Sequence, residues 1–125
     1  MAIAEATRDT FEKLITESTF TIIDFWAPWC GPCRAFAPIF EKASEEHPDV
    51  TFIKVNTEAE TELAAHFEIR SIPTLMIMRE QVIIYAEPGS LPASGLKDLI
   101  DKARALDMTE VHREIAANTS SVQKS

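Results

Sequence analysis

The sequence is poor in cysteine, glycine and basic residues. Among its 125 residues only two are cysteine and three are glycine, and 20 acidic residues outnumber 12 basic ones, for a formal net charge of -8. Two cysteines are too few for the disulfide framework of a small secreted domain. An acidic surface repels phosphate backbones and anionic lipids, so we expect neither nucleic acid nor a membrane as a partner. The chain also has no apolar run of bilayer length.

The first residues lack the basic segment and the continuous apolar stretch of a secretory signal. We therefore expect a cytoplasmic protein in a reducing compartment, where a close pair of cysteines is more often catalytic or metal-binding than structural. The length suits one domain, which can bury roughly two-thirds of the surface of its unfolded chain.

Both cysteines lie in one short stretch, FWAPWCGPCRAFAP at residues 25–38, with Gly31 and Pro32 between Cys30 and Cys33. A disulfide across so small a ring removes little chain entropy, so it would contribute little stability. An apolar, β-branched run precedes the pair and a helical pattern follows it, which puts Cys30 at the N-terminus of a helix. Free backbone N–H groups and the helix dipole favour a thiolate there. Cys33, one turn further on, should be more buried.

This placement suits a two-step exchange, in which Cys30 attacks a disulfide of another protein and Cys33 then attacks Cys30 to release the reduced partner. Gly31 allows the tight turn and Pro32 stiffens the ring. Two alternatives stay open. One is half of a zinc site shared between two chains, although the three histidines are scattered and no second cysteine pair exists. The other is a pair of inert buried thiols.

Hydrophobic periodicity predicts the order α, β, α, β, α, β, β, α. The expected result is a mixed sheet covered by helices on both faces. The expected elements are a weak strand at 3–6, a helix from a capping box at 9–12, a strand at 20–26, a helix at 33–47, a strand at 51–55, a helix from a capping box at 57–60 to about 67, strands at 74–78 and 82–86, and a helix at 92–106.

The last residues form an extension, so we divide the chain into a domain at 1–107 and an extension at 108–125. Met108, Val111 and Ile115 have helical spacing, and the residues from 118 onward predict a disordered tail. We favour a short, frayed continuation of the preceding helix. The alternative is a small apolar face that docks on the body or on another chain.

Five motifs occur in order: DFWA at 24–27, WCGPC at 29–33, Pro38, IPT at 72–74, and Gly89. In these residues the chain resembles the thioredoxin family, over roughly residues 3–106. The resemblance implies an α/β fold, the thioredoxin fold, with a central mixed sheet of four to five strands flanked by helices on both faces. It also implies a protein-disulfide reductase, with Cys30 as the nucleophile, Cys33 as the resolving cysteine, and a redox disulfide between them.

Asp24 and Lys54 are the candidate supporting residues. From the pattern alone, a buried Asp24 with a raised pKa and a solvated Asp24 at a strand edge are about equally expected. The resemblance implies the first, with proton transfer between Asp24 and Cys33, and it implies that Lys54 tunes Asp24.

The resemblance further implies a cis bond between Ile72 and Pro73, facing the cysteines and keeping metal out of the thiol site. A shallow docking surface for clients would surround the nucleophile. Its expected members are Trp29, Gly31, Pro32, Ile72, Pro73 and Gly89.

The resemblance implies no bound cofactor and no metal. Electrons would come from NADPH through a flavin-containing thioredoxin reductase, and disulfide-containing proteins would be the clients. Two other functions are possible on this fold: a binding or chaperone subunit with incidental redox activity, and a thiol oxidant or isomerase. Gly31 and Pro32 between the cysteines resemble the reducing members of the family more than the oxidising ones.

Overall fold

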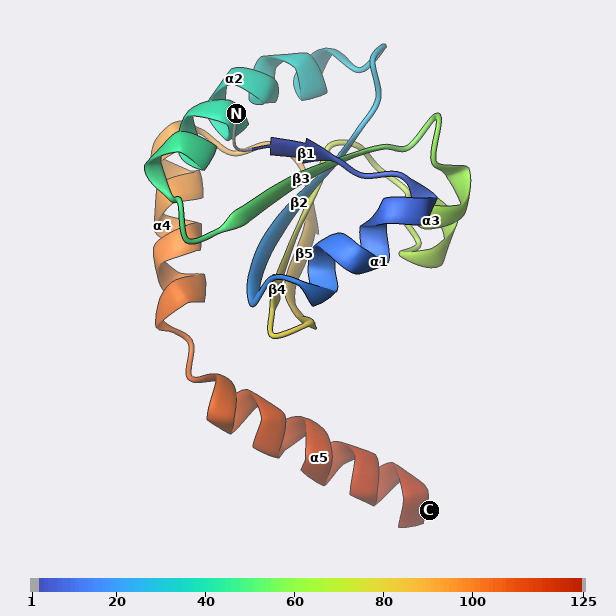
Figure 1. Cartoon of the computed structure of the whole chain (residues 1–125), viewed down its shortest axis with the longest axis vertical. Helices are drawn as coiled ribbons and strands as arrows, with labels where there is room; N and C mark the ends of the chain where they lie inside the picture. The colour runs from blue at the N-terminus through green and yellow to red at the C-terminus, as the bar shows by residue number, and fades with distance from the viewer. Residues whose placement is uncertain (1–2, 125) are drawn as a thin grey trace.

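A five-stranded mixed sheet forms the centre of the computed structural model, which describes residues 3–124 (Figure 1). The strands lie in the order β1-β3-β2-β4-β5; β1, β3 and β2 are parallel, while β4 is antiparallel to both β2 and β5. Their bounds are β1 Ile3–Glu5, β2 Phe20–Trp26, β3 Thr51–Asn56, β4 Thr74–Arg79 and β5 Val82–Pro88. The sheet therefore confirms the predicted α/β class, and the weak first strand is present.

Helices cover both faces of this sheet. Their bounds are α1 Arg8–Thr16, α2 Gly31–Glu46, α3 Thr61–His66, α4 Ala93–Ala105 and α5 Met108–Lys124. The apolar faces of α2 and α4 pack with one side of β2 and β3, where Phe40, Phe52 and Ile100 are fully buried. On the other side, Phe11 of α1 and Leu63 of α3 pack with the sheet. Because both faces are covered, β2 is buried along nearly its whole length.

Two helix starts differ from those predicted. α1 begins at Arg8, after the N-cap Thr7, and the hydroxyl of Thr10 accepts a hydrogen bond from the Thr7 backbone N–H at 2.9 Å. α3 begins only at Thr61. The hydroxyl of Thr57, the predicted cap, donates instead to the carbonyl of Trp26, and the side-chain oxygen of Asn56 accepts the N–H groups of Glu58 and Ala59. An asparagine side chain thus competes with the helix for these donors.

The turn between β4 and β5 uses two residues with positive φ although neither is glycine. Glu80 has φ 51° and Gln81 has φ 67°. A tight hairpin requires this left-handed backbone to match the twist of its strands, and a residue with a side chain adopts it at a cost of about 1 kcal/mol. The strands that this turn joins pair from Arg79 and Val82 to Thr74 and Pro88, with one irregularity between Ile77 and Met78.

α5 is a separate helix rather than a frayed continuation of α4. Leu106 has an extended backbone between the two helices, and the carboxylate of Asp107 accepts the N–H groups of Thr109 and Glu110. α5 then projects from the sheet and reaches Lys124, further than the short helix expected (Figure 1). Ser125 lies outside the described residues, and the domain division at residue 107 stays a prediction.

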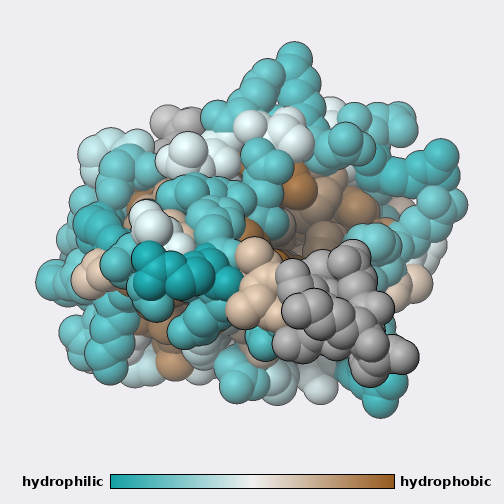
Figure 2. Space-filling view, turned by 90° about the horizontal axis from the view of Figure 1, so that it is seen from below, coloured by the Kyte–Doolittle hydropathy of each residue, from teal (hydrophilic) through white to brown (hydrophobic). Residues whose placement is uncertain are grey.

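The extension contacts the body near its start. Met108 is buried, and His112 pairs with Glu80 of the hairpin turn at 2.9 Å. Seen from the side on which α5 projects, most of the surface is hydrophilic and hydrophobic residues gather in a hollow (Figure 2). Within residues 3–124, no helix combines the length and the hydrophobicity needed to cross a bilayer.

Candidate functional site

Cys30 is the N-cap of α2, as the sequence predicted. The strand β2 ends at Trp26, a short loop follows, and Pro32 lies in the first turn of the helix. The sulfur of Cys30 accepts the backbone N–H of Cys33 at 3.2 Å. This N–H is one of the donors that a helix leaves free at its start, so the local fold itself provides a partner for a negatively charged sulfur.

Cys30 and Cys33 form a disulfide, with their Cα atoms 5.2 Å apart. Cys30 is 4% exposed and Cys33 is 2% exposed, so the predicted difference has the right direction but is small. Ala27, Trp26 and Ile72 pack around the two sulfurs. Trp29, directly before Cys30, is 66% exposed and is the most open large apolar side chain among the described residues.

The segment before β4 brings Ile72 and Pro73 to the disulfide, although about 40 residues separate them in sequence. The Ile72–Pro73 bond is cis. The carbonyl oxygen of Ile72 lies 3.8 Å from the sulfur of Cys30. Gly89, with φ 105°, donates its N–H to the carbonyl of Pro73 at 2.7 Å. This hydrogen bond holds the turn after β5 against the segment of Ile72 and Pro73.

The residues expected at a docking surface differ in accessibility. Trp29, Gly31, Pro32 and Gly89 are exposed, Ile72 is half-buried and Pro73 is buried. A Cβ atom added at Gly31 would meet nothing within 4 Å, so the space beside the first turn of α2 is open. Among the residues expected at this surface, solvent therefore reaches Trp29, Gly31, Pro32 and Gly89 most freely.

Asp24 is a fully buried carboxylate on β2, which excludes the solvated strand edge. Neither of its oxygens has a hydrogen-bond partner among the described residues. Burial raises the pKa of Asp24 from 3.8 to about 7, because the apolar surroundings disfavour the charged form. The positive charge of Lys54 lowers this pKa, and the negative charge of Glu5 raises it.

Lys54 lies directly beside Asp24 in the register of β3 with β2. Its ammonium group is 4.3 Å from the centre of the Trp26 ring, a cation–π contact. No ion pair within 4 Å involves Lys54 in the part of the chain that the structure describes. Lys54 thus acts on Asp24 through space. Sequence reasoning missed both the contact of Lys54 with Trp26 and the effect of Glu5 on Asp24.

The histidines lie apart from the cysteines. His47 contacts Arg104 at the end of α2, His66 stacks edge-on against Phe67, and His112 is on α5. Among residues 3–124, no group of three or more histidine, cysteine, aspartate or glutamate side chains is arranged to hold a metal ion.

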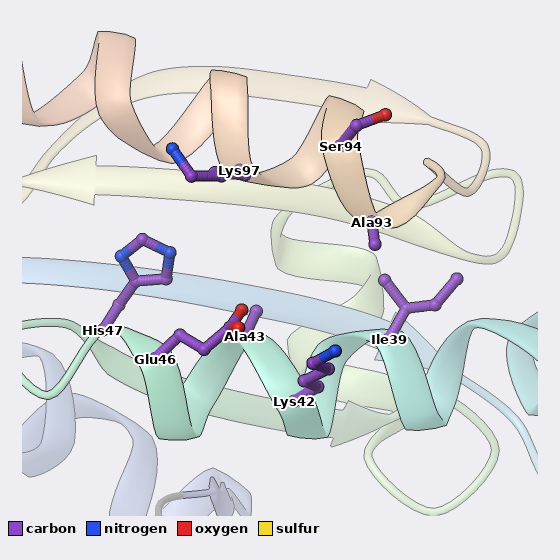
Figure 3. Close-up of a pocket in the computed structure, with 8 residues that line it drawn as sticks. All are labelled: Ile39, Lys42, Ala43, Glu46, His47, Ala93, Ser94 and Lys97. Carbon is purple, nitrogen blue, oxygen red and sulfur yellow. The ribbon is translucent and has the colours of Figure 1, made fainter.

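A shallow groove lies between α2 and α4, away from the disulfide (Figure 3). Its lining combines both charges with small apolar side chains: Ile39, Lys42, Ala43, Glu46, His47, Ala93, Ser94 and Lys97. Lys97 is already paired with Asp101 at 2.9 Å. With its charges of both signs, the groove shows no preference for one class of ligand.

An α/β sheet that presents a cysteine disulfide at a helix N-terminus, with a buried carboxylate on the strand that leads to it, defines a protein that exchanges dithiol and disulfide. The comparisons with known proteins agree. The family model named thioredoxin matches residues 2–102. A thioredoxin-type protein of Streptomyces coelicolor A3(2) is 54% identical over 112 residues, which cover 90% of this chain and 84% of that protein.

Thioredoxin 1 of Synechococcus elongatus is 40% identical over 105 residues, covering 82% of this chain and 98% of that protein. The solved structure of Plasmodium falciparum thioredoxin has a TM-score of 0.74 at 32% identity, covering 79% of this chain and 97% of that one. The chain belongs to the thioredoxin family. It is a protein-disulfide reductase that works by dithiol–disulfide exchange through the Cys30–Cys33 pair, and disulfide-containing proteins are its clients. A binding or chaperone subunit with incidental redox activity is not favoured.

Proposed function

We propose that Cys30 is the nucleophile of the exchange and that Cys33 resolves it. The Cys30 thiolate attacks one sulfur of a client disulfide; that S–S bond breaks, the second client sulfur leaves as a thiolate, and a mixed disulfide forms. Cys33 then loses its proton and attacks the Cys30 sulfur, and the first client sulfur leaves as a thiolate. The client gains two electrons and takes up two protons, while the Cys30–Cys33 disulfide forms.

The observation that carries this assignment is the position of Cys30 at the start of α2. Its sulfur accepts the Cys33 N–H at 3.2 Å, and the positive end of a 16-residue helix lies behind it. Both effects favour the thiolate and therefore increase the amount of nucleophile near neutral pH. Cys33 is the less exposed of the two, which suits attack on a sulfur already held beside it.

Asp24 is the proposed acceptor of the Cys33 proton, and Lys54 tunes it. A carboxyl group with a pKa of about 7 is partly charged and partly neutral at neutral pH, so it can both accept and return a proton. Its two oxygens have no other hydrogen-bond partner within the described chain, which leaves them free for this exchange.

Clients are proposed to bind across Trp29, Gly31, Pro32, Ile72 and Gly89, over the buried Pro73. The exposed Trp29 ring offers a flat apolar contact, and an extended client segment would meet the Ile72 backbone, whose carbonyl lies 3.8 Å from the Cys30 sulfur. Such a surface contacts backbone and small apolar groups rather than a particular side chain. It therefore suits several clients with accessible disulfides.

Electrons are proposed to come from NADPH through a flavin-containing thioredoxin reductase, with no cofactor bound to this chain, and the protein is proposed to work in the cytoplasm. The exchange cycle supports a separate electron donor, because each turnover leaves the Cys30–Cys33 pair oxidised. The Gly31–Pro32 pair, typical of the reducing members of the family, supports a reducing compartment.

The test is reduction of insulin disulfides, driven by NADPH and a thioredoxin reductase. We expect turnover with the native chain, none with Cys30→Ser, and a trapped mixed disulfide with Cys33→Ser. Absence of turnover in the native chain, with the thiol pair shown to be intact, would refute the proposed electron route. A mixed disulfide on Cys33 in the Cys30→Ser variant, at the native rate, would refute the assignment of the nucleophile.

A further inference from the structure

Three neighbouring strands place charged residues of alternating sign in one row of the sheet. Glu5 of β1 lies opposite Lys54 of β3, and Lys54 lies opposite Asp24 of β2. Paired residues in parallel strands point to the same face of a sheet. Glu5, Lys54 and Asp24 are therefore adjacent on one face, although they are far apart in sequence.

The row two residues earlier identifies that face. It consists of Ile3, Phe52 and Ile22. All three pack in the core cluster that α2 and α4 cover. Because side chains alternate along a strand, the charged row has the same orientation as this apolar row, at the end of the strands that leads to the disulfide loop.

A hydrogen bond from the residue after β1 holds this strand in register with β3. The backbone N–H of Ala6 donates to the carbonyl of Lys54 at 2.9 Å, directly after Glu5. Figure 1 shows β1, β3 and β2 side by side at this edge of the sheet. Accessibility increases toward the edge, since Asp24 is fully buried, Lys54 is half-buried and Glu5 is exposed.

Among the described residues, the ammonium group of Lys54 forms no ion pair with Glu5 or with Asp24. It lies 4.3 Å from the centre of the Trp26 ring, and β3, which carries Lys54, runs between the strand of Asp24 and the strand of Glu5. Glu5 attracts this cation and at the same time repels a negative charge on Asp24. Both effects favour the neutral form of Asp24, and they agree with the raised pKa of Asp24, to which Glu5 contributes.

We propose that Glu5 is a positioning residue for disulfide exchange, which acts across Lys54 to keep Asp24 protonated until neutral pH. The inference rests on the proposed role of Asp24 in proton transfer. The other groups around Asp24 do not replace Glu5. The residue that pairs with Asp24 on β4 is the apolar Leu75. The cysteines of α2 do not titrate while they form a disulfide.

The size of the effect follows from the strand spacing. Two strand intervals separate Glu5 from Asp24, which is about 10 Å between their backbones. At that distance, a unit charge near a protein surface changes the titration midpoint of another group by about 0.3 to 1 pH unit. Removal of the Glu5 charge should therefore lower the midpoint of Asp24 by that amount.

The experiment follows the carboxyl carbon of Asp24 by NMR, in the oxidised full-length protein, as a function of pH. We expect a midpoint near 7 in the native chain and a midpoint lower by about 0.3 to 1 unit in Glu5→Gln. Glu5→Asp keeps the charge and should leave the midpoint near the native value. Glu114→Gln, an exposed change on α5 with the same effect on net charge, should do the same.

An unchanged midpoint in Glu5→Gln, or an equal change in Glu114→Gln, would overturn the inference about Glu5. The pH profile of insulin reduction supplies the second measurement, and in Glu5→Gln it should move to lower pH together with the NMR midpoint. A moved midpoint with an unmoved profile would instead refute the proton-transfer role of Asp24. The two failures are therefore distinguishable.

Discussion

Replacement of Asp24 by asparagine should stabilise the oxidised protein at neutral and alkaline pH, and the gain should disappear in acid. The folded protein holds the Asp24 proton up to a pKa of about 7, whereas an unfolded chain releases it near 3.8. Between these values the folded state binds more protons than the unfolded state. Stability therefore falls as pH rises through this window, because the charge must form inside the core.

The magnitude follows from the two pKa values. Their difference corresponds to about 4 kcal/mol, reached above pH 7 and absent below pH 4. Asparagine has no charge at any pH, so it avoids this pH-dependent cost. Any constant effect of the buried amide cancels when the same two proteins are compared at two pH values.

The assay is urea unfolding of both oxidised proteins between pH 4 and 8.5, followed by tryptophan fluorescence. With an m-value of about 2 kcal/mol per molar urea, the difference between the two midpoints should grow by about 2 M across this range. Asp49→Asn is the control, and its effect on stability should change little between pH 4 and 8.5. The hydrogen bond from Arg104 lowers the pKa of Asp49, so that side chain stabilises above the unfolded pKa and stops doing so as pH falls.

A difference between Asp24→Asn and the native chain that stays constant from pH 4 to 8.5 would refute the reasoning. It would mean that Asp24 does not carry a buried charge, and the proposed proton transfer would lose its basis. A growing difference in Asp49→Asn with the same sign as in Asp24→Asn would point instead to a general effect of net charge.

Four further changes test the packing. Phe40→Ala should lower the free energy of unfolding by about 3–5 kcal/mol, because this fully buried ring packs between two others; a loss under 1 kcal/mol in urea unfolding would contradict it. Gly89→Ala should cost about 1–2 kcal/mol, since alanine resists φ 105° although its Cβ has free space; an equal or higher melting temperature would oppose this. Gln81→Gly should add about 0.5–1 kcal/mol, measured in the same way, by relieving φ 67°. Truncation after Asp107 should cost about 1–2 kcal/mol through loss of the buried Met108 and the exposed His112 pair, with insulin reduction unchanged; an unaltered melting temperature would show that α5 does not pack on the body.

The elements near the cysteines were predictable because their signals are local. The run at 20–26 predicts a buried strand from β-branched and aromatic residues alone, and the next pattern predicts a helix, so Cys30 had to lie at the junction. Helix starts were less predictable. Before α3, the hydroxyl of Thr57 donates to Trp26 and the side chain of Asn56 accepts the N–H groups of Glu58 and Ala59, and the pattern at 57–60 reveals neither contact.

The surroundings of the supporting residues could not be predicted from the sequence, because they depend on contacts between distant segments. The pattern left Asp24 undecided between core and solvent, and only the covering of both sheet faces buries it. Ile72 reaches the sulfur of Cys30 because β4 pairs with β2. Glu5 was missed because a three-residue edge strand has almost no signal of its own, and its partner strand is 46 or more residues away.

The sequence alone placed the two cysteines at the N-terminus of a helix. That placement depends only on spacing and periodicity among neighbouring residues. Tertiary structure alone decided the charge that Asp24 can carry. Its pKa depends on which strands lie beside β2 and on what excludes water from them, and both are settled only when segments from the whole chain pack together.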